Sequence, residues 1–323
     1  MHVVIPDEYQ DAIERLACYA LLDDHDVTRY REPATSFEEL VERLRPADAI
    51  VAIRERVNFD RALIERLPNL KLIALVGRNA TTIDYAACTD HGVMVSRGQS
   101  NAPASPAELT VALILASRRN IVIEAERMRR GEWPYTLSHR LRDSTLGIFG
   151  LGNIGTLVAQ AGSGLGMKVL VWGQAHSAKV AGESGYEVAA SKAALFERSD
   201  VLSLHVRLRP ETTGIVGPED LARMKPTALL VNTSRAELIQ PGALLAALRG
   251  GRPGYAAVDV YEQEPIMRGE HPFLSMPNVI CTPHLGWAEW ENFELYYAEA
   301  FEQIAAFAAG KPLRLVNPDV KPR

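Results

Sequence analysis

The sequence lacks features that mark several large classes of protein. Its three cysteines, Cys18, Cys88 and Cys281, are widely spaced among 323 residues, which excludes a disulfide framework and a CxxC metal or redox motif. Lys and Arg (35) are outnumbered by Asp and Glu (40), so the basic surplus typical of nucleic-acid binders is missing. We therefore expect a reducing compartment, no metal site and no nucleic-acid partner.

Long hydrophobic runs are also missing. The most apolar stretch, residues 109–116, is interrupted by Thr110 and is much shorter than the ~20 residues that a membrane-spanning helix needs. Residues 1–5 lead directly into Pro6, Asp7 and Glu8, which is unlike a signal peptide. The sequence thus predicts a cytoplasmic protein without a membrane partner.

Short apolar runs do alternate with helical patterns along the whole chain. The runs in the second half are almost continuously apolar, as expected of strands that helices cover on both faces. At ~150 residues per domain, this alternation predicts an α/β fold with two doubly wound parallel-sheet domains. Strands are expected at residues 3–5, 48–53, 72–76, 93–95, 146–149, 169–172, 201–205, 229–232, 256–260 and 279–281.

Helix signals fill the gaps between these runs. Ser36 and Glu39 have the spacing of a capping box, and another helix is expected to begin near Asp60. A long helical pattern covers residues 105–130 and is expected to end at Gly131. A last amphipathic helix is predicted over residues 289–308.

A glycine-rich turn joins a predicted buried strand to a predicted helix. Gly150, Gly152 and Gly155 have GxGxxG spacing, and the helical pattern begins with Asn153 and Ile154. In a dinucleotide-binding turn, the first glycine permits the bend, the second leaves room for the pyrophosphate and the third packs closely on the strand. The alternative is an ordinary tight βα turn. We favour the first interpretation and predict that all five residues contact NAD or NADP.

The next strand bears on the choice between the two dinucleotides. Gly173 and Gln174 follow residues 169–172, where an acidic residue commonly binds the ribose of NAD. The missing carboxylate removes a repulsion against the 2′-phosphate of NADP and tips the prediction slightly towards that cofactor. Three polar residues in the following loop are candidates for contacts with the phosphate: His176, Ser177 and Lys179.

Three ionisable residues follow predicted strands in the second half, namely Arg235, Glu264 and His284. Ligands of open parallel sheets bind outside the carboxyl ends of the strands, so these side chains are expected to meet beside the dinucleotide. Histidine titrates near neutral pH and exchanges protons, and a carboxylate beside it orients the ring and favours the imidazolium. Arginine offers a planar fork of donors to a carboxylate and a keto oxygen.

These residue types suit the reduction of a 2-keto acid. We assign His284 as acid/base, Glu264 as its partner, and Arg235 as substrate binder and carbonyl polariser. Taken singly, each is readily explained as an ordinary surface or loop residue. Their occurrence together with the glycine turn favours catalysis.

The order and spacing of these motifs resemble the D-isomer-specific 2-hydroxyacid dehydrogenase family. The resemblance covers residues 48–318 and implies hydride transfer between NAD(P)H and C2 of a small 2-keto or 2-hydroxy acid, as in glyoxylate/hydroxypyruvate reductases. Some relatives are dinucleotide-sensing corepressors, and this regulatory function is kept as the alternative. The matching segments are residues 145–155, 205–213, 224–237, 256–265 and 282–286.

The resemblance implies further contacts with the cofactor. Asp259 matches the family's aspartate that binds the nicotinamide amide, and His205 with Val206 matches its cofactor-contacting turn. Residues next to these motifs are expected to contribute as well: Thr233, Ser234 and Gly286.

The resemblance also implies a substrate-carboxylate loop formed by Gly77, Arg78 and Asn79. In this loop, Asn79 and Thr81 stand where glycine and aspartate are common. The family fold implies a flavodoxin-like substrate domain made of residues 1–101 and 292–323. A Rossmann-type NAD(P)-binding domain, residues 102–291, is expected to be inserted into it. A homodimer through the cofactor domain is expected.

Overall fold

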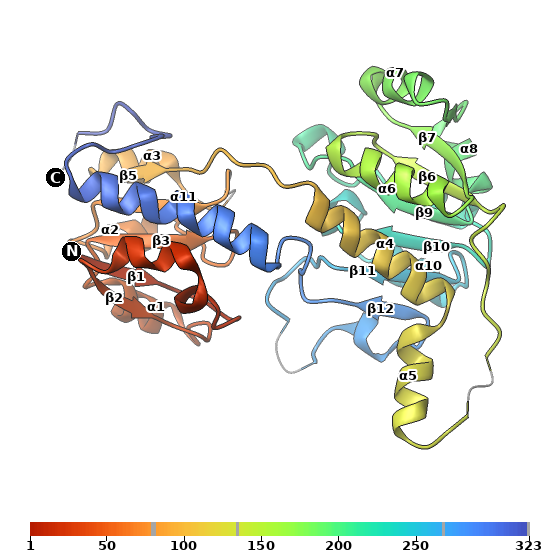
Figure 1. Cartoon of the computed structure of the whole chain (residues 1–323), viewed down its shortest axis with the longest axis horizontal. Coiled ribbons are helices and arrows are strands. Elements are labelled where there is room, and N and C mark those ends of the chain that lie inside the picture. Colours follow the sequence, from red (N-terminus) through yellow and green to blue (C-terminus); the bar gives the residue numbers. More distant parts are fainter. Residues whose placement is uncertain (79–81, 134–135, 267–268, 322–323) are drawn as a thin grey trace. The chain divides into compact units, whose positions relative to one another are not determined.

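The computed structural model describes residues 1–78, 82–133, 136–266 and 269–321. Contacts divide the chain into two compact units. The first comprises residues 1–102 and 289–323, and the second comprises residues 103–288 (Figure 1). The boundaries expected from the sequence lie one and three residues from these. Asn79, one of the predicted substrate contacts, lies outside the described residues.

The first unit is built on a five-stranded parallel sheet with the strand order β2-β1-β3-β4-β5. This is the flavodoxin-like order of doubly wound sheets. Every residue of β3 and β4 is buried, as expected of central strands between two layers of helices. The strands are β1 (His2–Ile5), β2 (Asp26–Arg29), β3 (Ala49–Ile53), β4 (Leu72–Val76) and β5 (Met94–Ser96).

The three short helices of the first unit, α1 to α3, begin at residues whose side chains cap them. The Ser36 side chain accepts a hydrogen bond from the Glu39 amide, and the Asp60 side chain accepts one from the Leu63 amide. The longest helix of this unit, α11, lies near the C-terminal end of the chain and packs on β4. The helices are α1 (Phe37–Leu44), α2 (Arg61–Glu65), α3 (Tyr85–Asp90) and α11 (Trp290–Ala308).

The second unit is built on a seven-stranded parallel sheet with the order β12-β11-β10-β9-β6-β7-β8. Its first strand, β6, lies between β7 and β9, so the chain proceeds in opposite directions from that point. Dinucleotides bind at this switch point in sheets of this order. The strands are β6 (Thr145–Phe149), β7 (Lys168–Trp172), β8 (Glu187–Val188), β9 (Val201–Leu204), β10 (Leu229–Asn232), β11 (Tyr255–Val258) and β12 (Val279–Cys281).

Alternate residues of the central strands belong to two separate apolar clusters. On β10, Leu229 and Val231 pack in the cluster that α4 and α6 cover, whereas Leu230 packs in the cluster that includes α8, α9 and α10. Figure 1 shows α4 and α6 side by side over one face of this sheet. The helices are α4 (Ala104–Arg118), α5 (Ile121–Arg129), α6 (Asn153–Gly164), α7 (Ala175–Glu183), α8 (Lys192–Arg198), α9 (Pro218–Arg223) and α10 (Ala243–Arg249).

The prediction of one continuous helix over residues 105–130 is wrong. Asn120 has φ 56° and ψ 29°, and this left-handed residue separates α4 from α5. Asparagine adopts this conformation more readily than most residues, because its short polar side chain can bond locally. The predicted end at Gly131 agrees with the structure, where this glycine has φ +77° and follows α5.

Among the described residues, no helix combines the length and apolar character that a bilayer crossing requires. The same part of the chain holds no group of three or more His, Cys, Asp or Glu side chains placed to bind a metal ion.

Candidate active site

The glycine turn lies between β6 and α6, at the switch point of the second sheet. Gly150 has φ +95°, and a Cβ atom there would lie 3.0 Å from the His205 carbonyl oxygen. A Cβ atom on Gly155 would lie 2.3 Å from the Gly150 carbonyl oxygen. These two glycines are therefore required by the protein's own packing.

Gly152 differs, because a Cβ atom there would meet nothing within 4 Å. Gly152 is the N-cap of α6, no side chain caps this helix, and Asn153 is its first residue. The open space beside the uncapped helix start is suited to a pyrophosphate group, which the N–H groups and the helix dipole would bind. The residues present thus fit the dinucleotide that the sequence predicts.

Helix α7, which follows β7, is tied to this turn. His176, Ser177 and Lys179, which the sequence placed in a loop, lie in this helix. Ser177 is buried, and its hydroxyl accepts a hydrogen bond from the Leu151 amide at 3.0 Å. Ser177 therefore stabilises the turn, and its contact with a 2′-phosphate stays a prediction. Gln174 is the exposed N-cap of α7, and Gly173 lies beside the Gly150 backbone.

Residues after β9 and β10 meet on the same edge of the sheet. The Ser234 hydroxyl donates to the Val206 carbonyl oxygen at 3.0 Å, and the Thr233 hydroxyl lies 2.7 Å from that of Thr110. The His205 ring is hydrogen-bonded to the Ser203 hydroxyl at 2.8 Å. Burial lowers the pKa of His205 to about 4, so this imidazole is neutral at physiological pH.

The centre of the candidate active site is a histidine–carboxylate pair. The His284 Nδ1–H donates to Glu264 Oε2 at 2.6 Å, while Glu264 Oε1 accepts from the Tyr261 amide at 2.9 Å. Among the described residues, no side chain bonds the other ring nitrogen of His284, Nε2. His284 has φ 52°, a conformation that costs energy in a non-glycine residue and is concentrated at functional sites.

The charge state of Glu264 follows from its surroundings. Burial alone would raise its pKa. The hydrogen bond and charge of His284, the Tyr261 amide and the charge of Arg235 outweigh burial and lower the pKa below its ordinary value. Glu264 is therefore ionised at neutral pH.

Arg235 is held by the turn that follows β10. The Asn232 side chain donates to the Arg235 carbonyl oxygen at 2.9 Å and accepts from the Ser234 amide at 3.1 Å. The Arg235 guanidinium donates to the Ser234 carbonyl oxygen at 2.7 Å and is near enough to lower the pKa of Glu264. The sequence reasoning missed Asn232, although a polar residue at the end of an apolar run was the available signal.

Asp259 is fully buried and fixes the loop that carries His284. One of its oxygens accepts hydrogen bonds from the Thr282 hydroxyl at 2.6 Å and the Leu285 amide at 2.7 Å. The other accepts from the Gly286 amide at 2.9 Å. Burial raises the pKa of Asp259 against these bonds. Its contact with the nicotinamide amide stays a prediction, since the structure shows a bond to the loop on each oxygen.

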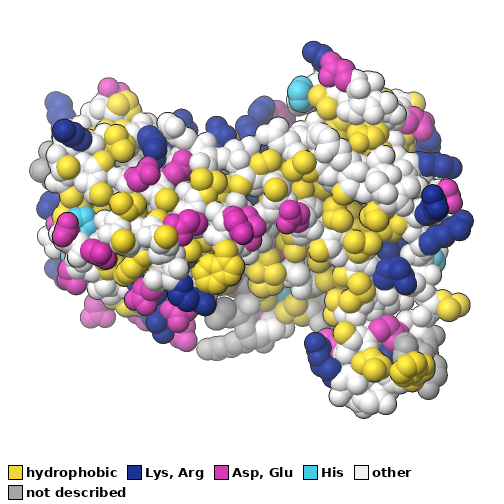
Figure 2. All heavy atoms as spheres, in the orientation of Figure 1, with side chains coloured by type: hydrophobic (Ala, Val, Ile, Leu, Met, Phe, Trp, Pro, Cys, Tyr) yellow, Lys and Arg dark blue, Asp and Glu magenta, His cyan; other side chains and the backbone are white. Residues whose placement is uncertain are grey.

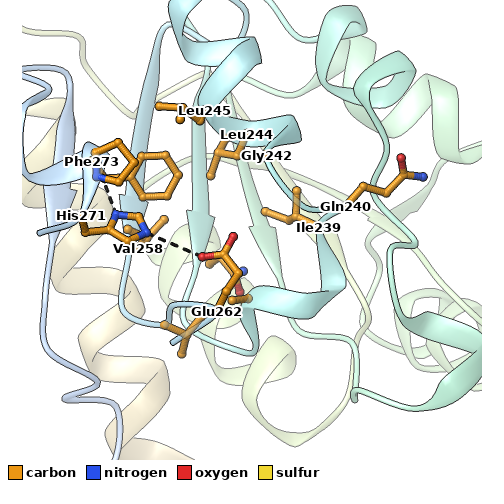
Figure 3. A pocket seen from close by; sticks show the side chains of 13 residues that line it. Ile239, Gln240, Gly242, Leu244, Leu245, Val258, Glu262, His271 and Phe273 are labelled. Carbon is orange, nitrogen blue, oxygen red and sulfur yellow. Dashed lines mark hydrogen bonds and ion pairs between the residues drawn. The ribbon is translucent and has the colours of Figure 1, made fainter. Parts of the chain in front are cut away.

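A pocket of about 210 Å³ lies beside these loops, against β10 and β11 (Figure 3). Its walls are mainly apolar, and His271 and Glu262 face each other in it at 3.6 Å. Among the described residues that line it there is no arginine or lysine, the side chains best suited to bind the carboxylate of a keto acid. We therefore do not place the substrate in this pocket.

In the first unit, the predicted substrate loop begins directly after β4. Gly77 has φ +107°, and its carbonyl oxygen accepts from the Gly98 amide at 2.7 Å. A Cβ atom on Gly77 would lie 3.1 Å from Nη1 of Arg54, a residue with φ 52° at the end of β3. The sequence reasoning missed Arg54 because the strand-end argument was applied only to the second half. Arg78 is exposed.

Three kinds of comparison with known proteins agree. Residues 111–286 match the model of a family described as D-isomer specific 2-hydroxyacid dehydrogenase, NAD binding domain. The chain is 34% identical to a glyoxylate reductase of Aeropyrum pernix, over 98% of this chain and 96% of that one. It is 35% identical to a glycerate dehydrogenase of Methylorubrum extorquens, over 91% of this chain and 92% of that one.

A solved structure gives the same result. The phosphoglycerate oxidoreductase of Vibrio cholerae O395 superposes with a TM-score of 0.93 at 44% identity, over 96% of this chain and 99% of that one. The sequence, the fold and the residues beside the glycine turn thus all lead to one family.

Proposed function

The chain belongs to the D-isomer-specific 2-hydroxyacid dehydrogenase family and is an NAD(P)-dependent oxidoreductase, and we propose that His284, Glu264 and Arg235 carry its chemistry. The observation that supports these roles best is the 2.6 Å hydrogen bond between His284 Nδ1 and Glu264 Oε2. In this bond Nδ1 of His284 is paired with the Glu264 carboxylate, so the other ring nitrogen, Nε2, points away from Glu264.

The reaction that suits these groups is the reduction of a small 2-keto acid. NADH or NADPH, when bound, supplies the hydride that the keto carbon receives. His284 donates the proton from Nε2 to the keto oxygen, and ionised Glu264 keeps the imidazolium available for this step. Arg235 binds the substrate carboxylate and polarises the carbonyl through its fork of N–H groups.

We propose that the cofactor is held by the turn between β6 and α6. Gly152 provides space, and the first N–H groups of α6, around Asn153 and Ile154, bind the pyrophosphate. Gly173 and Gln174 offer no carboxylate to repel a 2′-phosphate, which supports the use of NADP as well as NAD. The neutral His205 with Val206, Thr233, Ser234, Asp259 and Gly286 are proposed as the remaining contacts.

We propose glyoxylate and hydroxypyruvate as the first substrates to test. The relative from Aeropyrum pernix is named a glyoxylate reductase, and that from Methylorubrum extorquens a glycerate dehydrogenase. Gly77 and Arg78 stay predicted contacts of the substrate carboxylate. The related proteins compared above are all named as enzymes, and nothing in the comparisons favours the dinucleotide-sensing alternative.

We also propose that the protein is a cytoplasmic homodimer that associates through the second unit. None of the residues of α5 is buried, and large apolar side chains on it and on the following segment are exposed. Figure 2 shows apolar side chains at the surface of this segment, at the lower right. All three cysteines are unpaired, which suits a reducing compartment. The exposed apolar residues are Ile121, Val122, Met128, Trp133 and Leu137.

The test is a matrix of keto acids against both reduced dinucleotides. Glyoxylate, hydroxypyruvate, pyruvate and phenylpyruvate are each combined with NADH and NADPH, and dinucleotide oxidation is followed by absorbance. We expect turnover with glyoxylate or hydroxypyruvate, and a product of D configuration where C2 is chiral. Tight dinucleotide binding without turnover on any acid would contradict the proposed activity and favour a regulatory function.

A further inference from the structure

The first unit has a cavity of about 370 Å³ whose lining includes three arginines. They come from three separate stretches of the chain: Arg78, Arg97 and Arg314. None of the described residues that line the cavity is acidic; the others are Gly98, Gln99 and Leu315. We propose that this cavity is a binding site for a phosphate-like oxyanion.

The fold itself brings two of the arginines together. The segment after α11 pairs with β5, because the Val316 amide donates to the Val95 carbonyl oxygen at 2.8 Å. The Ser96 hydroxyl donates to the Leu313 carbonyl oxygen at 2.8 Å. Arg97 then donates its amide to the Arg314 carbonyl oxygen at 3.2 Å. The two residues are thus neighbours across a backbone ladder that does not depend on their charges.

The third arginine is fixed close to this pair. Arg78 follows Gly77, whose carbonyl oxygen accepts from the Gly98 amide at 2.7 Å, and Gly98 follows Arg97. Three cations therefore lie around one cavity although like charges repel each other. Such an arrangement calls for a counterion.

The acidic side chains of the protein neutralise only part of the positive charge of these three arginines. In the described part of the chain, neither Arg78 nor Arg97 forms an ion pair. Arg314 pairs with Glu302 at 3.3 Å, but its Nη1 atom is buried without a hydrogen-bond partner in that same part. The other carboxylate nearby, Glu299, accepts from the backbone amides of residues 99 and 100. A buried donor without an acceptor is costly, and an anion in the cavity would supply one.

The chemistry of the donors indicates the class of ligand. Planar guanidinium groups bind phosphate and similar oxyanions through paired N–H···O bonds. The cavity leaves room for more than the oxyanion itself. Two sources share this chemistry, namely a free inorganic anion and the phosphorylated end of a small acid. The site includes neither His284 nor Arg235, but it shares Arg78 with the predicted substrate loop, so its use by the end of a substrate rests on the proposed function.

Binding is tested by calorimetric titration of the full chain with inorganic phosphate at constant pH and ionic strength. We expect saturable binding to the unaltered protein. Arg97→Gln should weaken it about tenfold or more, the loss expected for a charge-assisted bond, and Arg97→Lys should weaken it less. Arg97 is exposed, so neither substitution disturbs the core. Arg45→Gln, at another exposed arginine of this unit, is the control and should leave binding unchanged.

Two outcomes would overturn the proposal: no saturable binding of phosphate, or equal affinity in the unaltered protein, Arg97→Gln and Arg45→Gln. Kinetics then identify the source of the anion. If the site takes the end of a substrate, Arg97→Gln raises KM for 3-phosphoglycerate but not for glycerate. If it takes a free anion, added phosphate changes the rates with both substrates, and Arg97→Gln removes that response. Loss of turnover with phosphate binding retained would count against the proposed function alone.

Discussion

At the scale of single residues, the main feature is that each member of the proposed catalytic trio is held by a different kind of restraint. His284 is carried on a strained loop that the buried Asp259 fixes by hydrogen bonds. Glu264 is bound by an amide on one oxygen and by His284 on the other. Arg235 lies on a turn that the Asn232 side chain closes. Such restraints limit the motion of the reacting groups and so favour catalysis.

The role of Arg235 is tested by Arg235→Lys. Lysine keeps the charge but cannot reproduce the fork of donors, so we expect a higher KM, a lower kcat and a kcat/KM reduced about 10- to 100-fold. Steady-state kinetics with glyoxylate measure both constants. Arg249→Lys, at the end of α10, is the control and should change neither. An unaltered kcat/KM in Arg235→Lys would show that this residue does not bind the substrate.

The role of Glu264 is tested by Glu264→Gln. The amide cannot stabilise an imidazolium, so kcat should fall and the loss of activity at alkaline pH should begin at a lower pH. Glu262→Gln is a matched control on the same loop, because Glu262 pairs with His271 instead. Identical pH–rate profiles for Glu264→Gln and the unaltered enzyme would contradict the assignment.

Glu264 also makes stability depend on pH. Its folded-state pKa is lowered from an ordinary value of 4.5, so the unfolded chain binds a proton at higher pH than the folded chain does. The stabilisation is present above that ordinary value and is lost as the pH falls through the lowered pKa. Urea denaturation of the protein and of Glu264→Gln should therefore show a stability difference at pH 7 that shrinks on acidification. A pH-independent difference would exclude this coupling.

At the scale of elements, the turn between β6 and α6 contains glycines required for different reasons. Gly155 is needed for packing within the protein, whereas Gly152 leaves space for the proposed pyrophosphate. Gly155→Ala places a Cβ atom against the Gly150 carbonyl oxygen, so it should lower Tm and cost about 1–3 kcal/mol as well as weaken dinucleotide binding. Gly152→Ala meets nothing in the protein, so it should lower Tm much less than Gly155→Ala, by no more than the preference for glycine over alanine at an N-cap, while weakening dinucleotide binding.

Thermal denaturation and fluorescence titration with NADH measure these two quantities. Gly164→Ala, at the far end of α6 where a Cβ atom also has space, is the control; it should leave dinucleotide binding unchanged and should not lower Tm. Undiminished dinucleotide affinity in Gly152→Ala would contradict the placement of the pyrophosphate.

Most of the strands could be predicted from the sequence, because a buried strand is a short, almost continuous run of apolar residues. The bounds of β4, β10 and β12 agree with the expected ranges, and the other expected strands agree within two residues. The edge strands β2 and β8 were not predicted, since a strand with one neighbour is only partly buried and needs no apolar pattern. The break at Asn120 depends on one backbone conformation, which the helical pattern of the flanking residues conceals.

The trio itself could be predicted because topology brings strand ends to one edge of a sheet. The restraints on the trio could not, since Asn232 and Asp259 act through bonds to backbone amides and carbonyls that no spacing reveals. Sequence position also did not reveal that Ser177 is buried and bonded to the Leu151 amide, because that contact depends on how α7 packs against the glycine turn.

At the scale of the whole molecule, the exposed face of α5 bears on assembly. If two chains associate there, placing charge on it should prevent association, since desolvating an unpaired carboxylate is costly. We expect light scattering to give twice 35.5 kDa for the protein and 35.5 kDa for the double variant Ile121→Glu with Met128→Glu. Leu165→Glu, at an exposed apolar residue outside α5, is the control and should stay dimeric. A dimer that survives the double variant would exclude α5 as the interface.

The most direct test of the whole account compares the protein with His284→Ala in two measurements on the same samples, NADH binding by fluorescence and turnover of glyoxylate by absorbance. We predict that the variant binds NADH almost as well as the unaltered protein, whereas kcat falls by a factor of about 10²–10⁴, the usual contribution of a positioned acid. Turnover that survives unchanged in His284→Ala would contradict the account.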